Sequence, residues 1–223
     1  MRKIFDDLYE TRVDSPFPGL TTHAYFWTPH RVLFYSPATD ADFDGLAELG
    51  GVARQYLSHR DEAGPALVAI KDRFHNALHA PAGDLADIGR HTRVDVALEG
   101  RHTDDLGVEI IPTPGHSPGA VCYLVPGAEG RYLFTGDTLF RLADGRWRAG
   151  YIEGIHQPAD AETIAASLGV LADVTPDVVI SSAFQDDAVH RVDARQWHRI
   201  LEEAEHGLPL GIAKCLPVAD GPE

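Results

Sequence analysis

The sequence is poor in cysteine and in cations, and each shortage excludes a class of protein. Its two cysteines, Cys122 and Cys215, form no CxxC pair and are too few for a disulfide framework. Cys122 lies in the apolar run 120–125 and is expected to be a small buried residue. The 19 Lys and Arg residues are outnumbered by 34 Asp and Glu residues, which gives a net charge of -15. Because a nucleic-acid backbone needs a basic surface, we expect no nucleic-acid partner.

Long apolar segments are also lacking. No apolar run approaches the ~18 residues of a membrane-spanning helix, so we expect no membrane partner. The residues from Met1 to Asp7 contain no apolar signal core, and we therefore expect a cytoplasmic protein. A metal cation or a neutral molecule suits the acidic charge, and we expect a small-molecule substrate. The oligomeric state stays open, a homo-oligomer included.

The apolar segments that are present predict a mixed α/β protein. At 223 residues, the chain is long enough for one α/β domain or two small ones. A hairpin is predicted around residues 28–30, and further strands and helices follow from apolar periodicity. The later strands are predicted over residues 108–113, 120–125, 131–135 and 177–180, and the helices over residues 43–49, 65–74, 159–172 and after Asp193. Residues 1–19 are predicted to be an extended lead-in, and residues 209–223 a flexible tail.

Two turns, each at the end of an apolar strand, present good metal ligands. Residues 112–119 read PTPGHSPG and carry His116, and residues 134–138 read FTGDT and carry Asp137. Gly supplies backbone angles that are closed to other residues, and Pro stiffens the rest of the turn, which suits a preorganised site. The two turns resemble the "TPGHSPG" and "GDT" turns of the metallo-β-lactamase superfamily. The resemblance implies a single domain over residues 1–223, folded as a four-layer αββα sandwich with the site between the sheets.

The superfamily's main ligand loop, T-H-x-H-x-D-H, corresponds to a divergent loop in this chain. It reads SHRDEAG over residues 58–64, and two registers are open. In the first, which we prefer, Ser58-His59 matches the opening "TH", Asp61 replaces the second His, and the later Asp-His pair is lost. In the second, Glu62 replaces the final His. Both registers keep His59 and Asp61 as ligands.

The resemblance therefore implies four metal ligands: His59, Asp61, His116 and Asp137. Two imidazoles and two carboxylates suit Zn²⁺, Fe²⁺ or Mn²⁺, and the sequence does not choose among them. Superfamily members place a final His after a late strand, whereas residues 181–184 read SSAF here. We therefore expect an atypical site with one divalent metal ion, or none if the site has been lost.

Several other side chains have an open role. Glu62, His79, His156 and His190 are candidates to join the site, and His79 is also a candidate substrate contact. His23 is a second candidate substrate contact, because it lies in a strand whose counterpart in the superfamily approaches the site. For both His23 and His79, a packing role is the alternative.

The implied function is metal-dependent hydrolysis. A metal-bound water would attack an ester, thioester or lactone carbonyl, with Asp61 and Asp137 as the catalytic carboxylates. The alternative is a catalytically inactive scaffold or binding protein, which the missing His residues favour. A non-hydrolytic iron enzyme is a third hypothesis, since mixed His and carboxylate sites also support oxygen chemistry.

Overall fold

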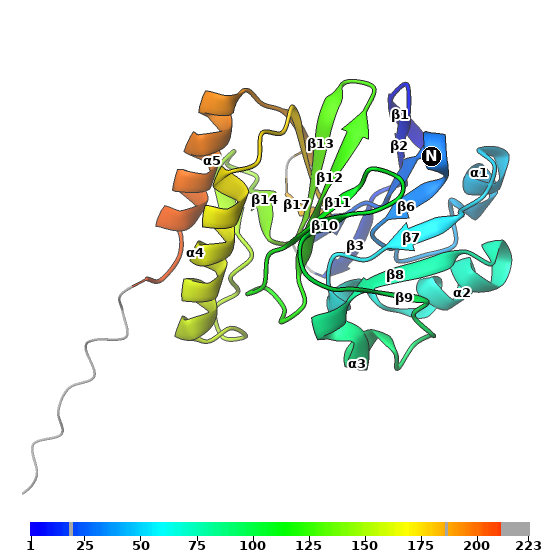
Figure 1. The fold of residues 1–223 in the computed structure, drawn as a ribbon, viewed down its shortest axis with the longest axis horizontal. Coiled ribbons are helices and arrows are strands. Elements are labelled where there is room, and N and C mark those ends of the chain that lie inside the picture. The colour runs from blue at the N-terminus through cyan, green and yellow to red at the C-terminus, as the bar shows by residue number, and fades with distance from the viewer. Residues whose placement is uncertain (18–19, 186, 211–223) are drawn as a thin grey trace, which may run out of the picture.

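The computed structural model describes residues 1–17, 20–185 and 187–210. Two β-sheets lie face to face, and helices cover the outer face of each sheet (Figure 1). Helices α4 and α5 lie on one side of the molecule, and α1, α2 and α3 lie on the other. This arrangement confirms the predicted four-layer αββα sandwich.

The first sheet has seven strands in the order β1-β2-β5-β6-β7-β8-β9. Their bounds are Arg2–Phe5, Leu8–Glu10, Tyr25–Trp27, Val32–Phe34, Arg54–Tyr56, Ala77–Pro81 and Val96–Leu98. Strands β5 and β6 pair antiparallel, which confirms the predicted hairpin, whereas β6, β7, β8 and β9 run parallel. Parallel neighbours need crossover connections. Helices α1 (Phe43–Glu48), α2 (Pro65–Phe74) and α3 (Leu85–Ile88) lie in these crossovers.

The second sheet has six strands in the order β10-β11-β12-β13-β16-β18. Their bounds are His102–Thr103, Glu109–Pro112, Val121–Gly127, Gly130–Gly136, Val178–Ser181 and Val189–Arg191. Two small sheets and three short 3₁₀ turns complete the described part of the chain. They are β14 (Leu139–Arg141) with β15 (Trp147–Ala149); β17 (Ala183–Phe184) with β4 (Leu20–Thr22) and β3 (Asp14–Phe17); and the 3₁₀ turns η1 (Thr28–His30), η2 (Arg60–Glu62) and η3 (Ala82–Asp84).

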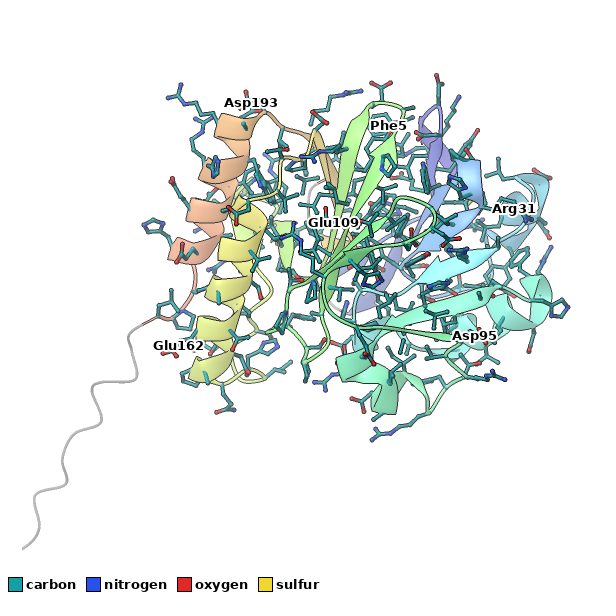
Figure 2. All side chains as sticks on the ribbon, in the orientation of Figure 1. Phe5, Arg31, Asp95, Glu109, Glu162 and Asp193 are labelled. Carbon is teal, nitrogen blue, oxygen red and sulfur yellow. The ribbon has the colours of Figure 1, made fainter. Side chains whose placement is uncertain are left out.

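Helices α4 (Pro158–Ala172) and α5 (Ala194–His206) cover the second sheet with one apolar face each. Ile164, Leu168 and Leu171 of α4 are buried, as their helical spacing predicts. Figure 2 shows Glu162 on α4 and Asp193 at the start of α5, where Asp193 accepts a hydrogen bond from a first-turn backbone N–H group. This contact makes Asp193 the N-cap of α5, which confirms the helix predicted after Asp193.

The core between the two sheets is built from large aromatic side chains. Phe34 of the first sheet stacks on Phe134 of the second, with ring centroids 4.1 Å apart. Tyr25 and Tyr123 are fully buried around this pair. Burying this much apolar area stabilises the sheet contact and makes a rigid base for the turns that leave it.

The predicted lead-in over residues 1–19 is wrong for its described part. Residues 2–17 contribute β1 and β2 to the edge of the first sheet and β3 to a small sheet. Arg2 and Lys3 of β1 are exposed while Ile4 and Phe5 are half-buried, so its sequence lacks the alternation that marks a half-buried strand. Most of the predicted tail, residues 211–223, lies outside the described residues. None of the described helices is long and apolar enough to cross a membrane.

Candidate metal centre

The four predicted ligands come from three strand ends. His59 and Asp61 lie in the loop that follows β7, around the turn η2. His116 lies in the turn between β11 and β12, and Asp137 directly follows β13. The structure therefore brings ligands from both sheets to one place.

Three of the predicted ligands, His59, Asp61 and His116, lie close enough together to hold one metal ion, and Asp137 lies beside both imidazoles. Asp137 Oδ2 lies 3.5 Å from His59 Nε2 and 3.7 Å from His116 Nε2. Asp61 Oδ2 lies 3.5 Å from His116 Nε2 and 4.0 Å from His59 Nε2. One ligand atom each from His59, Asp61 and His116 lies within 4.8 Å of the others. With metal–ligand bonds of ~2.0–2.1 Å, ligands around a tetrahedral ion are ~3.4 Å apart.

The two imidazoles also fit a metal chemically. His59 is 2% exposed and His116 is 7% exposed, yet neither Nε2 atom has a hydrogen-bond partner. A buried polar atom without a partner costs free energy, so a native structure normally gives it one. A cation between the two nitrogens and the two carboxylates would satisfy all four groups.

A backbone carbonyl orients His116. His116 Nδ1 lies 2.8 Å from Gly150 O, which places a hydrogen on Nδ1 and leaves the lone pair on Nε2. Gly150 is needed there because a Cβ atom would lie 2.1 Å from Asp137 O. His156 holds the same turn, since its Nδ1 accepts from Ile152 N–H and its Nε2 donates to His116 O at 2.9 Å. His156 thus supports the ligand without joining the cluster.

A buried carboxylate supports His59. Glu62 Oε1 lies 3.3 Å from His59 Nδ1. Glu62 also accepts hydrogen bonds from the backbone N–H and the hydroxyl of Ser58, and that hydroxyl lies 2.9 Å from His59 Nδ1. The Glu62 contacts are therefore on the side of His59 away from the ligand cluster, where a carboxylate fixes the imidazole tautomer.

Ser182, in the turn after β16 where a final His was expected, supports Asp137. Ser182 donates a hydrogen bond to Asp137 Oδ1, which leaves Oδ2 facing the imidazoles. The β13 turn can approach the β7 loop only because Gly136, at φ +55°, has no Cβ atom. A Cβ atom there would lie 2.2 Å from Ser58 Oγ.

Burial and neighbouring charges have opposite effects on the pKa values of the cluster. Burial lowers the pKa of His59, but the carboxylates of Asp137 and Glu62 outweigh it and raise the pKa well above 6.5. Burial raises the pKa of Asp137, but His59 and His116 outweigh it and hold the pKa far below its ordinary value. Burial also raises the pKa of Glu62. Carboxylates on both sides of a buried imidazole favour a bound cation, and a divalent ion can displace the proton.

Three cavities reach the predicted metal ligands, and one of them, of about 580 Å³, is lined by both Asp61 and His116. A cavity of about 1070 Å³ reaches His116 and Asp137. Its apolar lining includes Phe140, Leu142, Tyr151 and Ile152. A smaller cavity of about 210 Å³ reaches His59 and Asp61, and His23 lines it. His23 therefore lies where it can contact a molecule bound in this cavity. Its ring stacks on Phe184, with ring centroids 5.0 Å apart.

His79 and His190 lie in other surroundings. His79 is buried and stacks on Tyr56, with ring centroids 4.4 Å apart. Burial, and then the charge of Arg54, lower its pKa to about 4. His190 meets the edge of Trp147, with ring centroids 5.0 Å apart. The structure brings neither ring to the ligand cluster.

Comparison with known proteins agrees with this geometry. The family model of the metallo-beta-lactamase superfamily matches residues 38–182, and the chain belongs to this superfamily. Hydroxyacylglutathione hydrolase of Acidiphilium cryptum is 36% identical over 153 residues, which are 66% of this chain and 57% of that protein. The cytoplasmic isozyme of hydroxyacylglutathione hydrolase from Saccharomyces cerevisiae is 31% identical over 97 residues, or 43% of this chain and 35% of that protein. The chain thus spans only part of the length of these relatives.

Solved structures share the fold at low identity. A metallo-beta-lactamase from Pontibacter korlensis has a TM-score of 0.63 and 15% identity, covering 90% of this chain and 97% of that one. An archaeal metallo-beta-lactamase superfamily protein from Sulfolobus tokodaii has a TM-score of 0.61 and 18% identity, covering 87% and 84%. These matches confirm the predicted fold.

Sequence reasoning missed three residues that support the ligands. It treated Ser182 only as a missing His, and it assigned no role to Gly150 or to Ser58 beyond matching the motif. A Gly that packs under a ligand leaves no local pattern, because the contact joins segments far apart in the chain. Glu62 was recognised as a candidate, but its role needed the loop's three-dimensional path.

Proposed function

We propose that the protein is a metal-dependent hydrolase that cleaves thioesters or esters with an apolar acyl part. One divalent metal ion would be held by His59, Asp61, His116 and Asp137. The observation that supports this most strongly is the pair of buried Nε2 atoms that have no hydrogen-bond partner and face two carboxylate oxygens. Zn²⁺ is the first candidate, because two imidazoles and two carboxylates form a mixed nitrogen and oxygen set that it accepts.

A metal held in such a site polarises a carbonyl and lowers the pKa of water towards ~7. The chain's own residues would do the rest. Asp137, with Oδ1 held by Ser182, is fixed in place and keeps Oδ2 on the ligand side. Asp61 is 55% exposed and borders the smaller cavity, so its carboxylate can accept a proton from an attacking water.

The larger cavity supports the substrate class. Its wall contains His116 and Asp137, so a bound carbonyl can reach the cluster. Phe140, Leu142 and Ile152 give the cavity apolar walls, which suit a hydrocarbon acyl group. The relatives named as hydroxyacylglutathione hydrolases favour a thioester over other carbonyl compounds.

The test is a hydrolysis assay on a panel of acyl thioesters, p-nitrophenyl esters and lactones, with metal-free and Zn²⁺-reconstituted protein. We expect thioester cleavage that needs Zn²⁺ and falls at least ~100-fold in His116→Ala and Asp61→Ala. His198→Ala, at an exposed position on α5, is the matched control and should keep full activity. Cleavage that survives metal removal would contradict the proposal.

The inactive scaffold remains the rival, and Ser182 favours it. A hydroxyl there cannot replace an imidazole ligand, so the chain departs from the superfamily at a position that normally binds metal. Absence of both metal binding and turnover across the panel would support this rival.

A further inference from the structure

A buried carboxylate outside the cluster contacts both metal-ligand loops. Asp84 lies at the end of η3, after β8, and is 1% exposed. Its Oδ2 accepts hydrogen bonds from the backbone N–H of Arg60, at 3.0 Å, and from the hydroxyl of Ser117. Its Oδ1 accepts from the backbone N–H of Gly119, at 3.0 Å.

The three donors sit beside the ligands themselves. Arg60 lies between His59 and Asp61, and Ser117 follows His116 in the chain. The β7 loop belongs to the first sheet, and the β11–β12 turn belongs to the second. Asp84 therefore joins two ligand-bearing segments that the topology delivers from different sheets.

The fit around Asp84 is close. A Cβ atom on Gly83 would lie 2.8 Å from the Cα atom of Gly119, and one on Gly119 would lie 2.7 Å from Asp84 N. A second link, from Val121 N–H to Ser58 O at 2.9 Å, ties the same two segments at the start of the β7 loop. The two links bracket His59 along the chain, with Ser58 before it and Arg60 after it.

We propose that Asp84 is a positioning residue that sets the spacing between the His59–Asp61 loop and the His116 turn. This inference rests on the proposed metal site. Metal sites tolerate ligand displacements of only ~0.2 Å, so a loop spacing left loose would weaken binding. A carboxylate suits the role because all three of its neighbours are donors, and charge-assisted hydrogen bonds are the strong ones.

The test compares Asp84→Asn with Asp87→Asn. Asn has nearly the shape of Asp, but its NH₂ group must face at least one of the three donors, which breaks that hydrogen bond. Asp87 lies three residues further on, and its carboxylate pairs with the guanidinium groups of Arg60 and Arg90. Asp87→Asn therefore removes one charge from the same segment and leaves the backbone of the ligand loop untouched.

The measurement is the dissociation constant for Zn²⁺, by competition with a chromophoric chelator, together with the visible spectrum of the Co²⁺-loaded protein. We expect Asp84→Asn to weaken Zn²⁺ binding about 10–100-fold and to change the Co²⁺ spectrum. Asp87→Asn should match the wild type in both. Thermal unfolding of the metal-free variants shows whether a weaker Zn²⁺ affinity comes from a changed spacing of the two ligand loops or from a destabilised fold.

Ser117→Ala keeps the test decisive if Asp84→Asn does not fold. It removes one donor to Asp84 and retains the backbone bonds from Arg60 and Gly119, so it should fold and bind Zn²⁺ several-fold more weakly. If Asp84→Asn folds and binds Zn²⁺ as tightly as the wild type, the role of Asp84 is overturned while the metal site stays intact. If Asp84→Asn does not fold, wild-type Zn²⁺ affinity in Ser117→Ala has the same meaning. A wild-type protein that binds no Zn²⁺ would overturn the metal site itself.

Discussion

Replacing Gly150 by Ala should damage the metal centre without touching a ligand. The added Cβ atom would lie 2.1 Å from Asp137 O and 3.0 Å from His116 Nδ1. Real Cβ atoms do not approach other atoms closer than 3.0 Å, so the two segments must separate by about 0.9 Å (3.0 minus 2.1). Gly150 does not have a positive φ, so the close approach, and not backbone strain, is the cause.

The expected size of this effect follows from what moves. A shift near 0.9 Å exceeds the ~0.2 Å tolerance of metal–ligand distances several times over, and it disturbs the hydrogen bond that orients His116. We expect Zn²⁺ affinity to fall about 10–100-fold. Overpacking should also lower the free energy of unfolding by about 1–3 kcal/mol.

Zn²⁺ titration and thermal unfolding of Gly150→Ala measure both effects. Gly169→Ala is the control, because Gly169 lies in α4 with open space around its Cβ position. Its helix should gain about 0.5–1 kcal/mol, with no change in Zn²⁺ affinity. If Gly150→Ala bound Zn²⁺ as tightly as the wild type, the close packing of the two ligand segments could not be what holds the site.

Two further predictions concern buried groups, Glu62 beside the cluster and His79 away from it. Glu62→Ala should weaken Zn²⁺ binding about 10–100-fold, because the His59 ring loses the carboxylate that orients it. Glu62→Gln keeps a hydrogen-bond acceptor and should lose less Zn²⁺ affinity. An equal loss of affinity in both variants would show that the charge of Glu62, and not the orientation of His59, is what matters. The pKa of His79, about 4 when folded against ~6.5 when unfolded, means that the unfolded chain binds more protons between these values. Stability should therefore fall as pH drops from 7 to 5, by about 1–2 kcal/mol from this residue, and denaturant titrations of His79→Gln should show a flatter pH dependence than the wild type.

The two turns and the fold could be predicted from the sequence because their signals are local. The residues TPGHSPG and GDT each combine a rigid Gly or Pro turn with a ligand, and His116 and Asp137 indeed meet at one site. The α4 helix could be predicted because Ile164, Leu168 and Leu171 repeat at helical spacing. Such features depend on neighbours in the chain, which the sequence displays directly.

The supporting contacts could not be predicted because they join distant segments. Asp84 looks like one acidic residue in a short helical turn, and its donors, Arg60 and Ser117, lie 24 and 33 residues away. Edge strand β1 was missed for a related reason, since pairing with β2 stabilises it more than any apolar pattern of its own. The role of Glu62 stayed open because two loop registers were possible, and its contacts with Ser58 and His59 depend on the three-dimensional path of the loop.

The most direct test of the proposed site is metal analysis of the purified protein, without added metal, for the wild type and for His116→Ala. The proposal predicts about one Zn, Fe or Mn ion per wild-type chain and almost none in the variant, since His116 supplies one of two imidazole ligands. His198→Ala should keep the wild-type metal content. Two tightly bound ions per wild-type chain would contradict the single-metal site, and equal metal in the wild type and His116→Ala would contradict the ligand assignment.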